Sequence, residues 1–168
     1  LTLLGIPVVG AAEHEADDVI GTLATTGDHV DVVTGDRDLF QLIDDSRDVR
    51  VVYTGRGMSN LEVLTDDGLG TKYGVRPGQY ADFAAMRGDA SDGLPGVAGI
   101  GEKSAATLLA QYGDLAGIIA AASDPSSAMT AGQRAKFDAA ADYLAVAPQV
   151  VEVVRTLDLP AFDAAIQV

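Results

Sequence analysis

Seven acidic residues in three short clusters are the side chains of this sequence best suited to chemistry. The clusters are Glu15, Asp17 and Asp18 in EHEADD, Asp36 and Asp38 in GDRD, and Asp89 and Asp92 in GDASDG. Two carboxylates about 4 Å apart repel each other by roughly 4 kcal/mol at an effective dielectric constant near 20, so a shared site needs cations or protonation. Hard divalent ions take oxygen ligands, and Mg²⁺ suits a site with few protein ligands and several waters. Two such ions roughly 3.5–4 Å apart assist phosphodiester displacement, which is the chemistry that this pattern indicates.

Each cluster also has a plain structural interpretation. Acids at a helix N-terminus complement the helix dipole by about 0.3–1 kcal/mol each, and GDRD could be a simple turn. The joint pattern is more specific, because ligands of an open α/β sheet bind outside the carboxyl ends of its strands. The first two clusters follow successive predicted strands, so parallel pairing would bring them to the same edge of the sheet.

A glycine-dense stretch, LPGVAGIGEKSAATLL, is the second chemical signal. Gly96, Gly99 and Gly101 allow a close approach of the backbone to a ligand, and the helix predicted after them exposes N–H groups that bind anions. Lys103 would supply a phosphate contact and Ser104 a hydroxyl group near the turn. This is the form of a helix–hairpin–helix, which binds the DNA backbone irrespective of base sequence. A glycine-capped turn between two packed helices is the alternative.

The elements that must position these residues alternate between strands and helices at first and are helical afterwards. Strands are expected at residues 8–9, 30–34 and 49–53, with a short edge strand at 61–65 and a last strand at 149–157. Helices are expected at 13–26, 39–43, 66–73, 77–87, 102–111, 114–122 and 131–146. This order predicts an α/β fold with a mixed, mainly parallel sheet flanked by helices, followed by a helical region.

Composition limits the classes of protein that fit. The chain has 168 residues, 48% of them hydrophobic, a net charge of −14 and no cysteine. It is long enough for one core, or for one domain with a small appendage. No apolar run approaches the roughly 20 residues of a membrane span, and no signal peptide is evident, so the cytoplasm is the default expectation. Phosphate-binding proteins usually carry a basic excess, and the simplest interpretation of the charge is a solvated acidic surface.

Four segments, in this order, resemble bacterial 5′–3′ exonucleases, the flap-endonuclease-like nucleases that often form the N-terminal domain of DNA polymerase I. They are EADDVIGTLA, VVTGDRDLFQLI, KYGVRPGQYADFAAMRGDASDGLPGVAGIGEKSAATLLAQYG and VRTLDLP. The similarity covers nearly all of residues 4–160. It implies a PIN-like α/β core, a helix-three-turn-helix DNA-binding region, and two-metal hydrolysis of DNA with a 5′ flap, nick or end during replication and repair.

The resemblance also implies roles for the acids. Glu15, Asp17 and Asp18 would serve one ion, and Asp36, Asp38, Asp89 and Asp92 the second. The first Mg²⁺ or Mn²⁺ ion would activate water and the second would assist the leaving group, with Glu15, Asp17, Asp36 and Asp38 as the catalytic set. Residues 93–112 would hold the duplex backbone, with a K⁺ ion bridging the turn to a phosphate. A monomer is expected, and a polymerase domain in the parent protein is an open option.

The same resemblance suggests a three-part organisation. Residues 1–64 would be the C-terminal part of the nuclease core, residues 65–147 the helical region, and residues 148–168 a returning strand and tail. Members of the family carry, before the region seen here, a first strand with a metal-binding aspartate, another such aspartate and a basic helical arch. An N-terminal truncation is therefore expected, which leaves open whether this chain cleaves DNA alone.

Two further classes of function stay open. A non-catalytic fragment that binds the DNA backbone would use the hairpin alone and lack the N-terminal metal ligands. A phosphatase or another small-molecule phosphotransferase would need only the second acidic cluster, and it would leave the hairpin and the third cluster unexplained.

Overall fold

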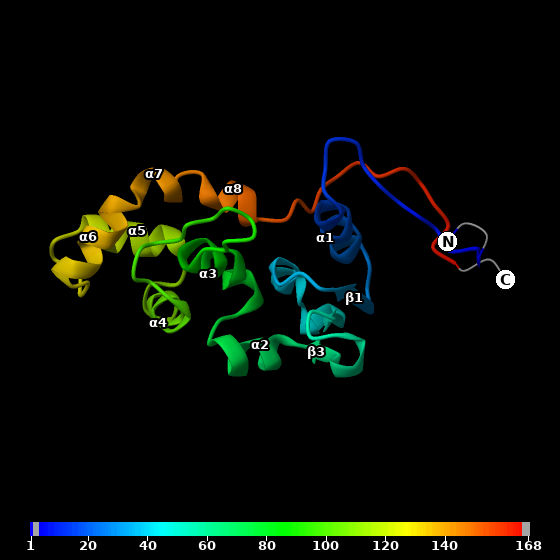
Figure 1. The fold of residues 1–168 in the computed structure, drawn as a ribbon, viewed down its shortest axis with the longest axis horizontal. Helices are drawn as coiled ribbons and strands as arrows, with labels where there is room; N and C mark the ends of the chain where they lie inside the picture. The colour runs from blue at the N-terminus through cyan, green and yellow to red at the C-terminus, as the bar shows by residue number, and fades with distance from the viewer. Residues whose placement is uncertain (2–3, 166–168) are drawn as a thin grey trace.

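A three-stranded sheet and a cluster of helices lie next to each other along the long axis of the molecule (Figure 1). The computed structural model describes residue 1 and residues 4–165. The strands are β1 (Val30–Thr34), β2 (Val49–Tyr53) and β3 (Glu62–Leu64). β1 pairs with β2 in parallel and β2 with β3 in antiparallel orientation. The sheet is therefore mixed, and the predicted α/β class is confirmed.

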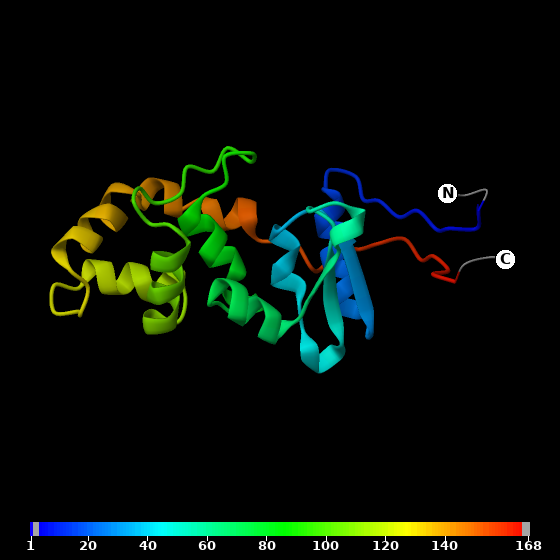
Figure 2. The same cartoon turned by 60° about the horizontal axis from the view of Figure 1, so that its bottom comes forward.

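Eight α-helices are found in the described part of the chain, most of them after the sheet. They are α1 (Ala16–Thr26), α2 (Asp66–Tyr73), α3 (Tyr80–Arg87), α4 (Glu102–Tyr112), α5 (Leu115–Ser123), α6 (Ala131–Ala139), α7 (Ala141–Leu144) and α8 (Ala147–Val151). Short 3₁₀ helices connect them: η2 (Asp38–Leu42), η3 (Asp45–Arg47), η4 (Met58–Asn60) and η5 (Pro77–Gln79). Figure 2 shows that both ends of the chain leave the molecule at the sheet end.

Local sequence explains where several helices begin and end. The Thr65 hydroxyl accepts a hydrogen bond from the Gly68 N–H and so caps α2, which ends at Gly74 in the left-handed conformation with φ 73°. Glycine has no Cβ and reaches this conformation without steric cost. α6 begins with a capping box between Thr130 and Gln133. These boundaries follow from side-chain hydrogen bonds that a sequence can reveal.

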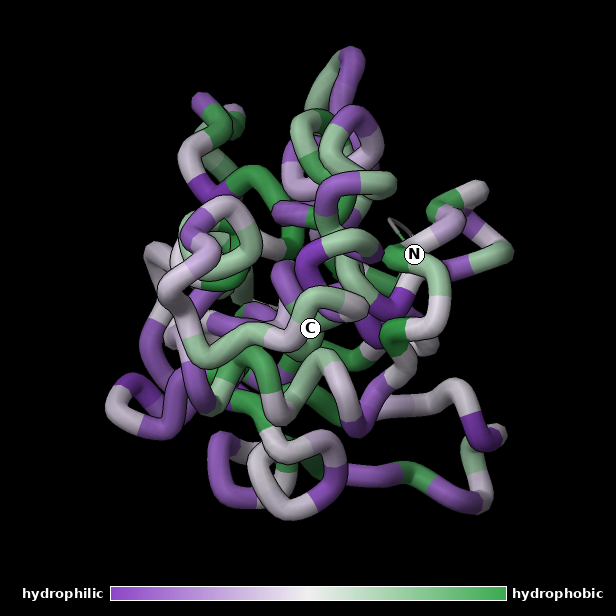
Figure 3. The backbone as a smooth tube through the Cα atoms, turned by 90° about the vertical axis from the view of Figure 1, so that its left-hand side faces the viewer, coloured by the Kyte–Doolittle hydropathy of each residue, from purple (hydrophilic) through white to green (hydrophobic). Residues whose placement is uncertain are grey.

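An aromatic cluster joins the sheet to the helices. Phe40 of η2 packs against Tyr53 of β2 and Tyr80 of α3, with ring centroids 5.3 Å apart in both pairs. Tyr73 of α2 and Phe83 of α3 complete the cluster. In Figure 3 the hydrophobic stretches concentrate toward the interior, whereas many projecting loops are hydrophilic. One continuous core therefore fixes the helical cluster relative to the sheet.

The strand predicted at residues 8–9 is wrong. This segment has no regular secondary structure, and the Val8 side chain is 69% exposed. Two adjacent valines fit a buried strand only if neighbouring strands satisfy their backbone hydrogen bonds, and no strand pairs with this segment among the described residues.

The returning strand predicted at residues 149–157 is also wrong. α8 ends at Val151, and the chain then runs extended beside α1. The N–H groups of Val153, Val154 and Leu157 donate to side chains at 3.0, 2.9 and 3.2 Å, respectively. Because these bonds take the place of a sheet ladder, the segment is extended without forming a strand.

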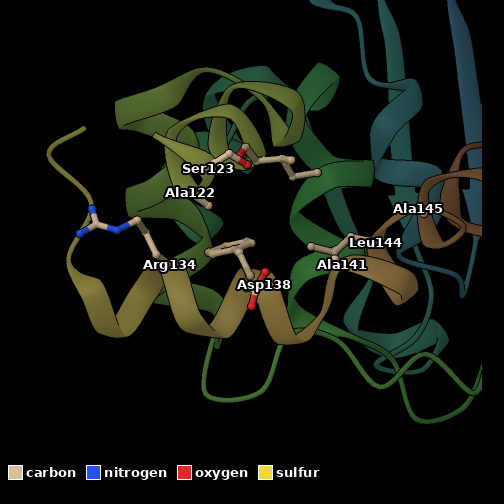
Figure 4. A pocket seen from close by; sticks show the side chains of 9 residues that line it. Ala122, Ser123, Arg134, Asp138, Ala141, Leu144 and Ala145 are labelled. Carbon is tan, nitrogen blue, oxygen red and sulfur yellow. The ribbon is translucent and has the colours of Figure 1, made fainter. Parts of the chain in front are cut away.

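Other differences are smaller. The helix predicted at 131–146 is broken at Ala140 into α6 and α7, and the helix predicted at 77–87 begins with the 3₁₀ turn η5. A hollow of about 300 Å³ lies between α5 and the α6–α7 pair, and the Arg134 side chain reaches away from it (Figure 4). Among the described residues, no single helix is long and apolar enough to cross a membrane, and the one helix pair with sufficient length, α4 with α5, is bent by 83°.

Candidate active site

Six of the seven predicted acids line a single cavity of about 270 Å³. They come from the N-terminus of α1, the turn after β1 and the loop between α3 and α4; the six are Glu15, Asp17, Asp18, Asp36, Asp38 and Asp92. Backbone and side chains of residues 150–153 close another side of the cavity. Segments far apart in the sequence thus meet at one acidic hollow, although no strand is found before the first cluster among the residues that the structure describes.

The acids of α1 have different environments. Asp18 accepts hydrogen bonds from the Val154 N–H at 2.9 Å and the Glu15 N–H at 3.3 Å, and it contacts His14 Nδ1 at 3.3 Å. Burial acts to raise the pKa of Asp18, but these hydrogen bonds outweigh it and the pKa is lowered. For Asp17, burial and then the neighbouring charge of Asp36 raise the pKa. Asp18 is therefore held as an anion by the protein itself, whereas Asp17 lacks such compensation.

The turn after β1 presents the second pair of acids. Asp36 Oδ1 accepts the Asp38 N–H at 2.9 Å, and the Asp36 N–H donates to the Thr34 hydroxyl at 2.9 Å, so the turn is fixed locally. Burial, followed by the charges of Asp36 and Asp92, raises the pKa of Asp38 to about 6, against a lowering effect of Arg87. A carboxyl group that is costly to ionise is typical of a position that a cation occupies during function.

The loop between α3 and α4 carries the third pair. Asp89 is bonded to the Ser91 N–H at 3.0 Å and to the Ser91 hydroxyl, and these bonds, with Arg87 nearby, lower its pKa. Reciprocal backbone bonds between Asp89 and Leu94, at 2.9 and 2.8 Å, close the loop. Asp92 faces the cavity, and burial, then Asp89 and Asp36, raise its pKa. Asp89 does not line the cavity and fixes the loop that carries Asp92.

Arg87 is a residue of the site that the sequence analysis missed. Its side chain is only 12% exposed, and Nη2 lies 3.4 Å from Asp89 Oδ2 while Nη1 lies 3.7 Å from Glu102 Oε1. Nε donates to the Gly88 carbonyl at 3.1 Å. The guanidinium group thus joins the acidic loop to the first residue of α4. Its position immediately before GDASDG was the only available signal.

Gln41 was missed as well. Its buried amide donates to the carbonyls of Asp38 and Val151, at 2.8 and 2.9 Å, and accepts the Val153 N–H at 3.0 Å. This single side chain holds the end of α8 against the turn that carries Asp38. A glutamine inside an apolar helical pattern gives no sequence signal for such a long-range contact.

The donor chemistry of the cavity suits a hard divalent cation, because its polar lining is dominated by carboxylates. Nevertheless, no group of three or more acids or histidines among the described residues is close enough to hold a metal ion as a ready-made cluster. Like charges repel, and several of these acids lack a cationic partner nearby. The residues present therefore fit the type of ligand expected, without forming a complete coordination shell.

The glycine hairpin lies between α3 and α4. Gly96 has φ 67°, and a Cβ there would lie 2.5 Å from the Arg87 carbonyl, so the close approach of two backbone segments requires glycine. Gly101 is the N-cap of α4, no side chain caps the helix there, and the space around its Cβ position is open. Lys103 and Ser104 lie exposed on the first turn of α4. The hairpin therefore presents free backbone N–H groups and a lysine to solvent.

A mixed sheet with acids at its edge, followed by a glycine hairpin between helices, defines a class of α/β nucleases. Two family models match: "5'-3' exonuclease, N-terminal resolvase-like domain" over residues 1–74 and "5'-3' exonuclease, C-terminal SAM fold" over residues 75–167. The chain belongs to the 5′–3′ exonuclease family, and the predicted family assignment is confirmed.

Relatives with curated names agree with this assignment. The chain is 56% identical over 161 residues to a 5′–3′ exonuclease of Streptomyces coelicolor, covering 95% of this chain and 54% of that protein. It is 49% identical over 160 residues to a 5′–3′ exonuclease of Mycobacterium tuberculosis, covering 91% and 50%. DNA polymerase I of Mycobacterium leprae is 50% identical over 123 residues, covering 71% and 13%. The chain thus spans about half the length of the two exonucleases.

Solved structures share the fold. A mutant of T5 5′-exonuclease superposes with a TM-score of 0.68 at 21% identity, covering 83% of this chain and 56% of that one. A bacteriophage T5 flap endonuclease in a pseudo-enzyme-product complex with DNA and metal ions gives the same TM-score at 20% identity, covering 83% and 50%.

Proposed function

We propose that the protein to which these residues belong hydrolyses DNA phosphodiester bonds as a structure-specific 5′–3′ exonuclease or flap endonuclease. The observation that carries the proposal is the convergence of six predicted acids on one cavity in a chain of the 5′–3′ exonuclease family. The solved T5 relative with DNA and metal ions supports the same substrate class.

Asp17, Asp36, Asp38 and Asp92 would hold the divalent ions, because they face the cavity and their carboxylates are the oxygen ligands that Mg²⁺ or Mn²⁺ prefers. When bound, two such ions would supply Lewis-acid stabilisation of charge and a water of lowered pKa. The protein contributes preorganisation: Gln41 and the Asp36 turn fix the backbone of Asp38. The division into one ion served by Glu15, Asp17 and Asp18 and a second served by the remaining acids stays a prediction.

DNA with a 5′ flap, nick or end would bind through the hairpin. Backbone N–H groups at the start of α4, with Lys103 and Ser104, would contact phosphates without reading bases. These groups would supply favourable contacts to phosphate at the hairpin despite the overall charge of −14. A K⁺ ion at the turn and a polymerase domain in the parent protein stay predictions, as do a monomeric state and a cytoplasmic location.

A non-catalytic module that binds the DNA backbone is the second candidate. The observation that favours it is the absence, among the described residues, of a ready-made cluster of three or more metal ligands. In this case the hairpin would bind DNA, and the acids would only cap helices and shape turns.

The test is cleavage of a labelled 5′-flap DNA by the 168-residue chain with Mg²⁺ or Mn²⁺, alongside binding measured in Ca²⁺. We expect cleavage, reduced about 10–100-fold or more by Asp38→Asn or Asp17→Asn. Asp67→Asn, which removes an exposed acid of α2, is the matched control and should leave the rate unchanged. Binding without turnover would support the module, and a chain that neither binds nor cleaves would contradict both candidates for these 168 residues.

A further inference from the structure

Lys136 of α6 lies on the hairpin although it is 37 residues distant from it in sequence. Its Nζ donates a hydrogen bond to the Gly99 carbonyl at 2.9 Å. A Cβ at Gly99 would lie 2.9 Å from Nζ and 3.3 Å from Cε, so the end of the lysine side chain packs directly on this turn. Gly99 is exposed, and its φ of 72° is the left-handed conformation that glycine adopts freely.

The position of Lys136 is fixed by its own helix. The next residue, Phe137, is buried against the core, and its side chain lines the hollow between α5 and α6. α6 is also anchored at its first turn by the capping box of Thr130 and Gln133. The helix that carries Lys136 is therefore fixed by packing and capping, and the hydrogen bond to the Gly99 carbonyl places the ammonium group at the hairpin.

Neither Lys136 nor Lys103 forms an ion pair with a carboxylate in the part of the chain that the structure describes. An ammonium group has three N–H donors, and the Gly99 carbonyl occupies one of them. Lys72, the remaining lysine, bonds to both carboxylate oxygens of Glu62 at 2.7 and 2.6 Å. The two lysines without acidic partners are thus the two at the hairpin: Lys103 lies on the first turn of α4, and Lys136 contacts Gly99.

We propose that Lys136 is a DNA-binding residue that contacts a backbone phosphate together with the uncapped N-terminus of α4. This inference rests on the proposed function and adds a residue from a separate helix to the predicted hairpin surface. The chain has 25 acidic and only 11 basic residues, so few positive charges are available to bind phosphate, and Lys136 places one of them beside the hairpin. The contact reads no base, so it contributes affinity and salt dependence without sequence preference.

The competing role is structural: Lys136 could only brace the turn through its bond to Gly99. Three substitutions separate the two roles. Lys136→Gln retains a hydrogen-bond donor and loses the charge, Lys136→Met loses both, and Lys136→Arg retains both. Arg56→Gln removes one exposed positive charge, 3.9 Å from Glu62 and outside the hairpin, and serves as the matched control.

The experiment measures binding of the full 168-residue chain to duplex DNA with a 5′ flap, in Ca²⁺, over a series of NaCl concentrations. Each phosphate contact contributes about 0.9 to the slope of log K against log salt. We expect Lys136→Gln and Lys136→Met to lower the slope by about 1 and to weaken binding about fivefold, whereas Lys136→Arg and Arg56→Gln stay close to the unmodified chain.

An unchanged slope in Lys136→Gln, with weaker binding only in Lys136→Met, would assign the structural role and overturn the proposal. The proposed function would stand in that case, because the unmodified chain still binds. A flat salt response of the unmodified chain would overturn both. Thermal unfolding of each variant excludes loss of folding as the cause. If Lys136→Met is unstable, Lys136→Gln decides, because it keeps a donor for the Gly99 carbonyl and loses only the charge.

Discussion

The seven acids that the sequence analysis singled out do not have equivalent environments. Asp18 and Asp89 are held as anions by backbone and side-chain hydrogen bonds, and their pKa values are lowered. Asp17, Asp38 and Asp92 have raised pKa values, with burial as the largest cause. Spacing and residue type could predict which acids gather, because motifs carry that information. They could not predict the full compensation of Asp18, because one of its donors, the Val154 N–H, comes from a distant segment, whereas Asp89 is compensated locally by Ser91.

Asp38→Asn should stabilise the chain at neutral pH when no divalent ion is present. Burial and neighbouring acids raise the Asp38 pKa from 3.8 to about 6, so the folded state holds this proton more tightly than the unfolded state. The resulting cost is absent below about pH 4 and fully developed above about pH 6. After a discount for partial exposure to solvent, we expect a gain of about 1–2 kcal/mol at pH 7.5. Urea unfolding at pH 4 and pH 7.5 measures it, and a gain of equal size at both would contradict the assignment.

Arg87→Met should lower the stability of the chain, in contrast to Asp38→Asn. Removing the guanidinium group leaves Asp89 and Glu102 without their nearest cation, and the Gly88 carbonyl loses a donor. Arg87 is largely buried, but its partners Asp89 and Glu102 are 32% and 52% exposed, so solvent screens part of the loss and we expect about 1–2 kcal/mol. Arg50→Met, at an exposed pair with Asp31, is the control and should cost under about 1 kcal/mol. Equal effects of the two changes on urea unfolding would show that Arg87 has no special role.

At the scale of elements, the apolar periodicity of the sequence correctly predicted the helices and strands whose limits depend on local interactions. The boundaries of α2 and α4, the end of α1 and the positions of β1 and β2 agree with their apolar patterns and caps, whereas α1 begins at Ala16, three residues later than predicted. The strands expected at residues 8–9 and 149–157 failed because an apolar run predicts burial or extension, and neither property creates a neighbouring strand. The partners of the second segment are side chains of α1 and Gln41, which no periodic pattern encodes.

Two glycines of the hairpin should respond differently to alanine. A Cβ at Gly96 would lie 2.5 Å from the Arg87 carbonyl and 2.7 Å from the Gly88 N, at a φ of 67°. Gly96→Ala should therefore cost at least about 2 kcal/mol, because backbone must move. Gly101→Ala meets open space at the N-cap and should change stability by about 1 kcal/mol or less.

A measurement of DNA binding then separates the loss of a contact with DNA from an effect on folding. If α4 presents its N-terminus to a phosphate, the methyl group introduced by Gly101→Ala would obstruct the bound phosphate without disturbing any protein contact. We expect Gly101→Ala to weaken binding of flap DNA while thermal unfolding stays nearly unchanged. Full affinity in Gly101→Ala would argue against a close approach of DNA at this turn.

The whole molecule combines a strongly negative chain with one rigid core. The aromatic cluster joins η2 and β2 to α2 and α3, and Gln41 and Arg155 fasten the segment after α8 to η2. The acidic cavity and the hairpin are therefore parts of the same body, linked by the short loop that carries Asp92. Net charge alone argued against a nucleic-acid ligand, but it does not describe how charge is distributed, since six of the predicted acids line one cavity.

This arrangement predicts that divalent ions stabilise the fold by binding, beyond simple screening of a charge of −14. A ligand that binds only the folded state at 100 times its dissociation constant contributes about 2.7 kcal/mol, and each kcal/mol raises Tm by about 2–4 °C for a chain of this size. We expect millimolar MgCl₂ or MnCl₂ to raise Tm by several degrees more than NaCl of equal ionic strength. The extra shift should disappear in the double variant Asp17→Asn with Asp38→Asn, and persist in Asp67→Asn. Identical shifts in MgCl₂ and NaCl would mean that the acids are only screened, and the cavity would then be a feature of the surface and not a metal centre.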